Sequence, residues 1–175
     1  MKQITIIGTG YVGLVSGAGI SDFGHQVTCV DILEEKISSL NQGVIPIYEP
    51  GLKDLVERNI RAGRLVFSTD IGREIKNSEV VFIAVGTPES ANGNADLTAI
   101  FSVAETIANH LNDYKVICTK STVPIGTGEK IIELIRSKTD QSFDYCSNPE
   151  FLREGSAVGD FLRPCLLYTS DAADE

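Results

Sequence analysis

Histidine and cysteine are both scarce in this chain, which limits the metal and thiol chemistry that it can carry. Two histidines and four cysteines occur among 175 residues, and no two cysteines form a CxxC pair. This spacing predicts neither a metal site nor a disulfide framework. We interpret the first three cysteines as small buried apolar residues, because they lie within or beside expected strands. The residues concerned are His25, His110, Cys29, Cys118, Cys146 and Cys165.

The chain also lacks an excess of positive charge and any long hydrophobic run. With 15 lysine and arginine residues against 24 acidic residues, its formal net charge is −9. An acidic chain lacks the basic surface that nucleic-acid binding requires. No apolar stretch is long enough to span a bilayer, and Met1 leads into an expected strand without the features of a signal peptide. We therefore expect a cytoplasmic protein with neither a nucleic-acid partner nor a membrane partner.

Strand-like and helix-like segments alternate along nearly the whole chain. Its composition, 42% hydrophobic and 22% charged, is ordinary for a globular protein, and its length suffices for one well-buried domain. The continuous apolar run at residues 80–85 is typical of a strand covered on both faces. The alternation predicts an α/β fold with a doubly wound parallel sheet. Expected strands are residues 3–7, 26–31, 65–68, 80–85, 115–120 and 143–147, and expected helices are residues 12–23, 34–41, 51–62, 71–76, 97–111 and 126–137.

A GxGxxG motif directly follows the first expected strand and opens an expected helix. Its glycines, Gly8, Gly10 and Gly13, would allow a tight turn, close approach to a pyrophosphate, and close packing of helix on sheet. Free N–H groups at the helix start would favour the phosphates. Asp31 stands at the end of the next strand, where it would accept from a ribose 2′-OH and repel the 2′-phosphate of NADP. The motif predicts a Rossmann-type domain that binds NAD; the alternative is a glycine-rich turn without a ligand.

Three further polar segments follow expected strands, at residues 86–88, 121–124 and 148–155. Because ligands of such sheets bind beyond the carboxyl ends of the strands, we expect these segments and the glycine motif to form one site. The hydroxyls of Thr87 and Thr122 could there bind a cofactor or hold a water. The alternative is that both threonines serve only the turns in which they lie.

Two carboxylates in the last segment, Glu150 and Glu154, are four residues apart. On a helical turn they would face one direction, where they could orient a water or act as acid and base. The alternative is a solvated pair with Arg153 as its counter-charge. The sequence leaves the roles of two lysines undecided. Lys36 would either flank the adenosine ribose or be a solvated helix residue, and Lys120 could be simply a charge at the end of a strand.

Six segments together resemble the UDP-glucose 6-dehydrogenases, and the resemblance runs over about residues 1–164. The related GDP-mannose 6-dehydrogenases share much of the pattern, but residues 45–51 and 120–128 look more like the UDP-glucose enzymes. The UDP-N-acetyl-hexosamine dehydrogenases are more distant. The six segments are residues 8–13, 30–31, 45–52, 85–88, 120–128 and 147–155.

The resemblance implies an enzyme that oxidises UDP-glucose to UDP-glucuronate in two hydride transfers to NAD. By position, Thr122 matches a threonine that helps to hold a catalytic water, and Glu150 matches a glutamate assigned to general-base or thioester-hydrolysis chemistry. The sugar-nucleotide contacts that it implies are Glu150, Phe151, Leu152, Arg153 and Glu154. The NAD contacts that it implies are Gly8, Gly10, Tyr11, Val12, Gly13, Asp31, Lys36, Thr87, Thr122 and Glu154.

The resemblance also places the family's nucleophilic cysteine, with its lysine and asparagine partners, in later segments that have no counterpart here. We therefore expect the chain to bind NAD without turnover, as the N-terminal part of an enzyme whose full-length form is a homodimer. The alternative is a stand-alone, non-catalytic NAD-binding module. Residues 165–175 resemble the translation of a sequencing-library adapter, so we expect a non-native, poorly packed tail after a domain at residues 1–164.

Overall fold

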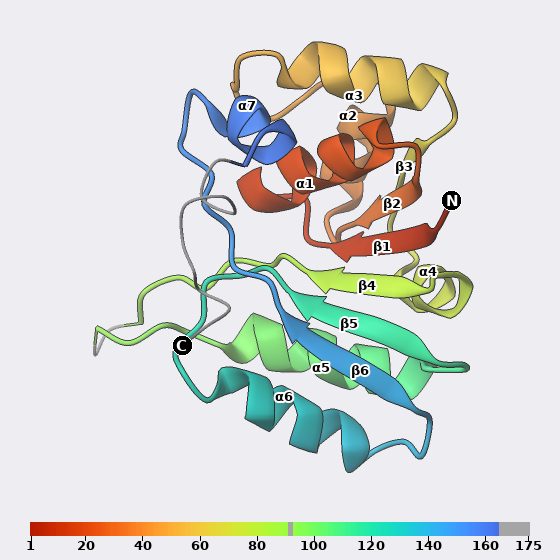
Figure 1. Ribbon diagram of the computed structural model, residues 1–175, viewed down its shortest axis with the longest axis vertical. Coiled ribbons are helices and arrows are strands. Elements are labelled where there is room, and N and C mark those ends of the chain that lie inside the picture. Colours follow the sequence, from red (N-terminus) through yellow and green to blue (C-terminus); the bar gives the residue numbers. More distant parts are fainter. Residues whose placement is uncertain (91–92, 165–175) are drawn as a thin grey trace.

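Six parallel strands form one sheet in the computed structural model, which describes residues 1–90 and 93–164. The strand order is β3-β2-β1-β4-β5-β6: the chain adds β2 and β3 on one side of β1 and β4 to β6 on the other, which is the order of a doubly wound sheet (Figure 1). The α/β fold class expected from the sequence is confirmed. The expected tail at residues 165–175 lies outside the described residues. The strands are β1 (Gln3–Ile7), β2 (Gln26–Val30), β3 (Leu65–Ser68), β4 (Val80–Ile83), β5 (Lys115–Thr119) and β6 (Phe143–Ser147).

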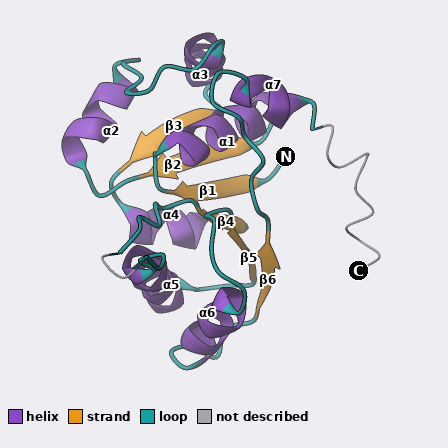
Figure 2. Cartoon of the chain, turned by 90° about the vertical axis from the view of Figure 1, so that its left-hand side faces the viewer, coloured by secondary structure: helices purple, strands orange, loops and turns teal. Residues whose placement is uncertain are grey.

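Helices cover both faces of the sheet, so the domain has three layers (Figure 2). One face carries α1 (Tyr11–Asp22), α2 (Glu34–Asn41), α3 (Leu52–Arg61) and α7 (Ala157–Leu162). The other face carries α4 (Ile71–Asn77), α5 (Thr98–His110) and α6 (Thr127–Arg136). Within the described ranges, no helix is both long enough and apolar enough to cross a membrane.

Each face of the sheet has its own apolar core, because successive strand residues point to opposite faces. Ile6 of β1 packs toward α1, whereas its neighbour Ile7 packs toward α5. Both side chains are almost completely buried. The central strands are therefore apolar on both sides, as the continuous run in β4 predicts.

The expected elements differ from the observed ones mainly at their ends. Strands β2, β4 and β5 end one or two residues earlier than expected, because the chain turns away into loops at the sheet edge. Helix α7 was not expected, since six residues are too few to show a helical hydrophobic period. The interpretation of the cysteines is correct for Cys29 and Cys118, which are buried. It is wrong for Cys146, which is exposed because β6 is an edge strand, and Cys165 lies outside the described residues.

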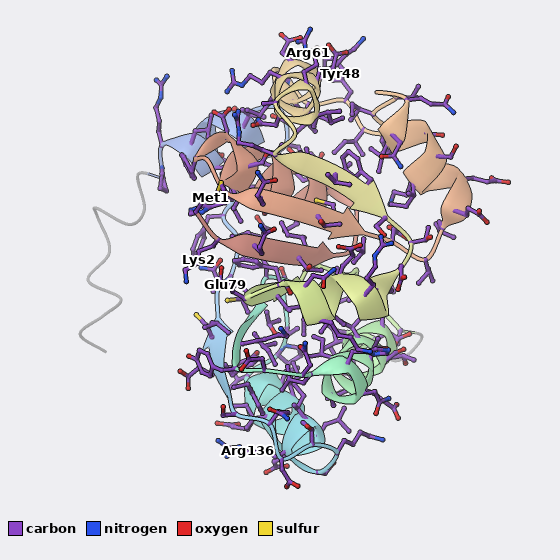
Figure 3. All side chains as sticks on the ribbon, turned by 90° about the vertical axis from the view of Figure 1, so that its right-hand side faces the viewer. Met1, Lys2, Tyr48, Arg61, Glu79 and Arg136 are labelled. Carbon is purple, nitrogen blue, oxygen red and sulfur yellow. The ribbon has the colours of Figure 1, made fainter. Side chains whose placement is uncertain are left out.

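The two ends of the strands differ in character. At the amino ends, Lys2 before β1 forms an ion pair with Glu79 before β4, and the two side chains lie side by side in Figure 3. The loops that contain the glycine motif and the polar segments all leave from the carboxyl ends. Because all six strands are parallel, these loops gather along one edge of the sheet.

Candidate functional site

The turn from β1 into α1 is built so that two of its glycines touch neighbouring backbone. Gly8 has a φ of 108°, a conformation that residues with a side chain rarely adopt. A Cβ on Gly8 would lie 2.4 Å from the carbonyl oxygen of Ala84, and a Cβ on Gly13 would lie 2.0 Å from the carbonyl oxygen of Gly8. The turn therefore packs tightly against both its own helix and the end of β4.

Gly10, the middle glycine of the motif, faces open space. It is the N-cap of α1, and apart from Gly10 and its two chain neighbours no described residue has an atom within 4 Å of the position that a Cβ would take. The N–H groups of Tyr11, Val12 and Gly13 have no hydrogen-bond acceptor among the described residues. An open approach to a helix start with free N–H groups fits the pyrophosphate of a dinucleotide.

Asp31 lies directly after β2, beside the same turn, and its carboxylate is held from several sides. Oδ2 accepts hydrogen bonds from the hydroxyl of Thr9 at 2.6 Å and from the backbone N–H of Thr9 at 3.1 Å. Oδ1 accepts from the N–H of Leu33 at 3.2 Å. Thr9 is an addition to the site residues taken from the sequence. Its only signal there was its place inside the glycine motif.

The charge of Asp31 is stabilised by the same contacts. Burial disfavours its ionised form, but the hydrogen bonds from Thr9 and Leu33, together with one from Lys36, lower the pKa of Asp31 below its ordinary value. Lys36 Nζ lies 3.2 Å from Asp31 Oδ2. Lys36 therefore pairs with Asp31 and is not simply a solvated helix lysine. Each carboxylate oxygen can accept more than one hydrogen bond, so Oδ1 keeps capacity for a ribose hydroxyl.

The loops after β4 and β5 contact each other at this edge. The hydroxyl of Thr87 donates to the backbone carbonyl of Thr122 at 2.9 Å, and the hydroxyl of Ser121 donates to that of Val85 at 2.7 Å. The structure thus brings together the two threonines selected from the sequence. Thr122 is exposed at this edge.

The segment after β6 is an extended loop, so the helical turn that would make Glu150 and Glu154 face one direction is not present. Residues 148–153 have no helical structure, and α7 begins only at Ala157. Pro149 disfavours helical backbone at Asn148, and the N–H of Leu152 donates to Glu150 Oε2 within the loop. The two glutamates are therefore not paired on one helical face.

Three neighbouring residues of this segment differ in their surroundings. Phe151 is 60% exposed, although it is large and apolar. Leu152 is half-buried and packs against the core under α1. The guanidinium of Arg153 forms an ion pair with Asp160 of α7 at 2.7 Å.

Glu49 connects the glycine motif to this segment, and sequence reasoning missed its role. Its buried carboxylate accepts from the phenol of Tyr11 and from the N–H groups of Gly155 and Ala157, both at 2.8 Å. Burial opposes ionisation, but these bonds lower the pKa of Glu49. Burial and the bond to Glu49 raise the pKa of Tyr11. The signal in the sequence was a glutamate inside the conspicuous Pro-Ile-Tyr-Glu-Pro run.

Lys120, which the sequence left open as a strand-end charge, is buried. Its Nζ donates to Asn148 Oδ1 at 3.2 Å and lies 5.8 Å from the ring centre of Phe161 in α7. Burial lowers the pKa of Lys120, and the nearby carboxylate of Glu150 partly offsets this effect. Lys120 therefore places a desolvated amine between the loops after β5 and β6.

Fold and site together define an α/β dinucleotide-binding domain: a doubly wound sheet, a glycine turn with free helix N–H groups, and a carboxylate at the end of β2. Among residues 1–90 and 93–164, no cluster of three or more histidine, cysteine, aspartate or glutamate side chains could hold a metal ion.

The sequence model of the UDP-glucose/GDP-mannose dehydrogenase family, NAD-binding domain, matches residues 2–166. The chain belongs to this family and represents its NAD-binding domain. It is 57% identical over 164 residues to UDP-glucose 6-dehydrogenase TuaD of Bacillus subtilis, covering 93% of this chain and 36% of that protein. It is 53% identical over 165 residues to UDP-glucose 6-dehydrogenase of Rhizobium meliloti, covering 93% of this chain and 38% of that protein.

Two solved structures have the same fold. A UDP-glucose dehydrogenase from Pyrobaculum islandicum matches with a TM-score of 0.90 and 36% identity, covering 94% of this chain and 39% of that one. A GDP-mannose dehydrogenase from Pseudomonas aeruginosa matches with a TM-score of 0.88 and 38% identity, covering 91% of this chain and 38% of that one. The chain thus spans little more than a third of the length of these relatives.

Proposed function

We propose that the chain binds NAD along the carboxyl edge of its sheet. The N–H groups of Tyr11, Val12 and Gly13 hold the pyrophosphate, and Asp31 accepts from the adenosine ribose. The observation that carries this proposal is the open space at Gly10 beside those free N–H groups. The other two glycines of the turn, Gly8 and Gly13, pack directly against neighbouring backbone. The family membership supports the choice of a nicotinamide dinucleotide.

We further propose that the chain acts as the N-terminal, NAD-binding part of an enzyme that oxidises UDP-glucose to UDP-glucuronate. Its identities of 57% and 53% to UDP-glucose 6-dehydrogenases support this substrate. NAD would accept one hydride when the alcohol is oxidised to the aldehyde, and a second NAD would accept another when the aldehyde level is oxidised to the carboxylate. Because the chain covers only 36% to 38% of those two relatives, the complete reaction needs parts that are not in its 175 residues.

Within that reaction, the loops after β5 and β6 supply the polar groups nearest to the chemistry. Thr122 holds a water through its exposed hydroxyl, and Glu150 acts on that water as a general base. The contact between Thr87 and Thr122 supports a shared position for the two loops beside the cofactor. Lys36, Thr87 and Glu154 complete the NAD contacts.

The sugar nucleotide lies against residues 150–154. An exposed aromatic ring at Phe151 and the cation of Arg153 suit a ligand with both a ring system and phosphates. A GDP-mannose substrate is the second candidate, supported by the 38% identity to the Pseudomonas GDP-mannose dehydrogenase. We propose that the full-length enzyme is a homodimer and that the present chain binds NAD without turning over substrate.

Calorimetric titration of the purified chain with NAD and NADP tests the first proposal. We expect saturable binding of NAD and at least tenfold weaker binding of NADP, because Asp31 would face the 2′-phosphate. Equal affinities would contradict the role of Asp31, and no binding of either would contradict the site. The loss of NAD binding in Gly10→Val, with the unfolding temperature unchanged, would locate the site at the turn.

The substrate is tested separately with an enzyme in which residues 1–164 replace the matching segment of the Bacillus UDP-glucose dehydrogenase. NADH formation is followed with UDP-glucose, GDP-mannose and UDP-N-acetylmannosamine as substrates. We expect activity with UDP-glucose and a loss of at least a hundredfold in kcat for Glu150→Gln. Activity with GDP-mannose alone would replace the proposed substrate. The unmodified chain, assayed in parallel, is expected to produce no NADH.

A further inference from the structure

Two cysteines face each other across the outer pair of strands. Cys118 of β5 and Cys146 of β6 are direct partners in the parallel ladder, so their side chains point to the same face of the sheet. Adjacent strands lie about 4.8 Å apart. Disulfides join Cα atoms that are roughly 4.4 to 6.8 Å apart. The Cα spacing of the pair therefore lies within the range of a disulfide, and a small movement of the edge strand has to bring the Cβ atoms closer.

The two thiols differ sharply in access to solvent. Cys118 is only 7% exposed, whereas Cys146 lies open on the edge strand. Burial, with smaller contributions from the Cys146 thiol beside it, raises the pKa of Cys118 to about 11. An oxidant in solution would therefore meet Cys146 first, with a protected thiol as its immediate neighbour.

We propose that Cys118 and Cys146 form a reversible disulfide when the protein meets a hydroperoxide. The sulfur of Cys146 attacks one peroxide oxygen; an S–O bond forms, the O–O bond breaks, and water or an alcohol leaves. The sulfur of Cys118 then attacks the Cys146 sulfur. The S–S bond forms, the S–O bond breaks, and the leaving hydroxide takes the Cys118 proton as water. The two thiols together supply the two electrons that reduce the peroxide.

The bridge would lie directly below the candidate site. Two residues beyond each cysteine, Lys120 and Asn148 are joined by a hydrogen bond of 3.2 Å between the ends of the same two strands. Strand β6 has a single neighbour in the sheet, so it can shift slightly to reach disulfide geometry without disturbing a second ladder. Oxidation would thus fix covalently the spacing of the loops that carry Thr122 and Glu150.

Peptide mapping under non-reducing conditions tests the proposal. The whole chain carries Cys165→Ser, because Cys165 lies outside the described residues and could compete as a thiol. After treatment with hydrogen peroxide and then alkylation, trypsin should release residues 116–120 linked to residues 139–153, with the loss of two hydrogens. Dithiothreitol should separate the two peptides. The proposal would be overturned if the protein with Cys118 and Cys146 intact gave only over-oxidised or alkylated Cys146, or only disulfides between two molecules.

Three variants control the assignment. Cys118→Ser should lose the linked peptides and accumulate a sulfenic acid at Cys146 that dimedone traps. If burial at position 118 prevents that variant from folding, Cys146→Ser, at an exposed position, should abolish the link in a folded protein. Cys29→Ala removes a buried thiol in the core under α1 and should leave the link unchanged. A disulfide between Cys118 and Cys29 in oxidised wild-type protein, in place of the link to Cys146, would also overturn the proposal.

Discussion

The phenol of Tyr11 donates a hydrogen bond to the buried carboxylate of Glu49, which stands 38 residues later in the chain. Tyr11 lies inside the glycine motif, and Glu49 also accepts from the N–H groups of Gly155 and Ala157. One carboxylate therefore joins the turn expected to hold the cofactor to the loop expected to hold the sugar nucleotide. The two loops are thus linked through the hydrogen bonds of a single side chain.

Replacing Glu49 by alanine should therefore destabilise the domain. The substitution leaves the Tyr11 hydroxyl and two backbone N–H groups without their acceptor inside the protein, and we expect a loss of about 3 kcal/mol in the free energy of unfolding. Urea denaturation followed by circular dichroism measures it. As a control, Glu57→Ala removes a glutamate of α3 whose pair with Lys53 is exposed, and should cost at most about 0.5 kcal/mol. Equal losses in the two variants would show that Glu49 has no special role.

Acid should remove the contribution of Glu49 in the same way. Because its pKa in the fold is lower than the ordinary value of 4.5, the stabilisation is complete above pH 4.5 and disappears as the pH falls through the lowered pKa. The difference in unfolding free energy between the wild type and Glu49→Ala should therefore shrink below pH 4.5. Denaturation curves of both proteins at a series of acidic pH values measure this difference. A gap that stays constant with pH would mean that the neutral carboxyl group binds its donors equally well.

The glycines of the turn should separate folding from binding. Gly13→Ala places a methyl group 2.0 Å from the backbone oxygen of Gly8, and we expect a loss of about 3 kcal/mol in stability. Gly10→Ala meets no atom within 4 Å, so stability should stay within about 0.5 kcal/mol while NAD affinity falls at least tenfold. Gly159→Ala in α7, which also has free space, is the control: it should leave NAD affinity unchanged and raise stability by at most about 1 kcal/mol through helix propensity. Normal NAD binding by Gly10→Ala would argue against the proposed pyrophosphate position.

The sheet and the position of the site could be predicted from the sequence because the information is local. Apolar runs define buried strands, parallel strands gather their loops at one edge, and the glycine motif marks the first turn. Strands β1, β3 and β6 and helix α2 agree with the expected residue ranges to the residue. The sequence left the backbone of the segment after β6 open, because the spacing of Glu150 and Glu154 also suits a helical turn.

The supporting contacts could not be predicted, because they depend on residues distant in the sequence. Nothing local shows that Glu49 binds the N–H groups of Gly155 and Ala157, since its partners lie 106 and 108 positions away. Lys120 looks like an ordinary charged residue until α7 places Phe161 over it. The burial of such groups is decided by packing, which hydrophobic periodicity does not encode.

Asp31→Ala should weaken NAD binding by about 1–3 kcal/mol, because the ribose loses its carboxylate acceptor. The variant also releases Thr9 and Lys36 from their partner, so its fold is checked by circular dichroism before titration. Asp54→Asn, which removes the same charge from an exposed position in α3, serves as the control and should bind NAD normally. Unchanged calorimetric affinity in Asp31→Ala would exclude Asp31 from the site, and an equal loss in Asp54→Asn would indicate a general effect of net charge.

The buried amine of Lys120 should cost the protein less stability in mildly alkaline solution than at neutral pH. Below its lowered pKa, Lys120 is charged in both the folded and the unfolded chain, and the fold bears the cost of a desolvated ammonium. Above that pKa the folded lysine is neutral, whereas the unfolded lysine keeps its proton up to its ordinary value of 10.5, so unfolding takes up a proton. The unfolding free energy of the wild type, measured against Lys120→Met by urea denaturation, should therefore rise as the pH increases from neutral toward 10.5. A difference that falls over this range would mean that Glu150 and Asn148 stabilise the ammonium more than burial destabilises it.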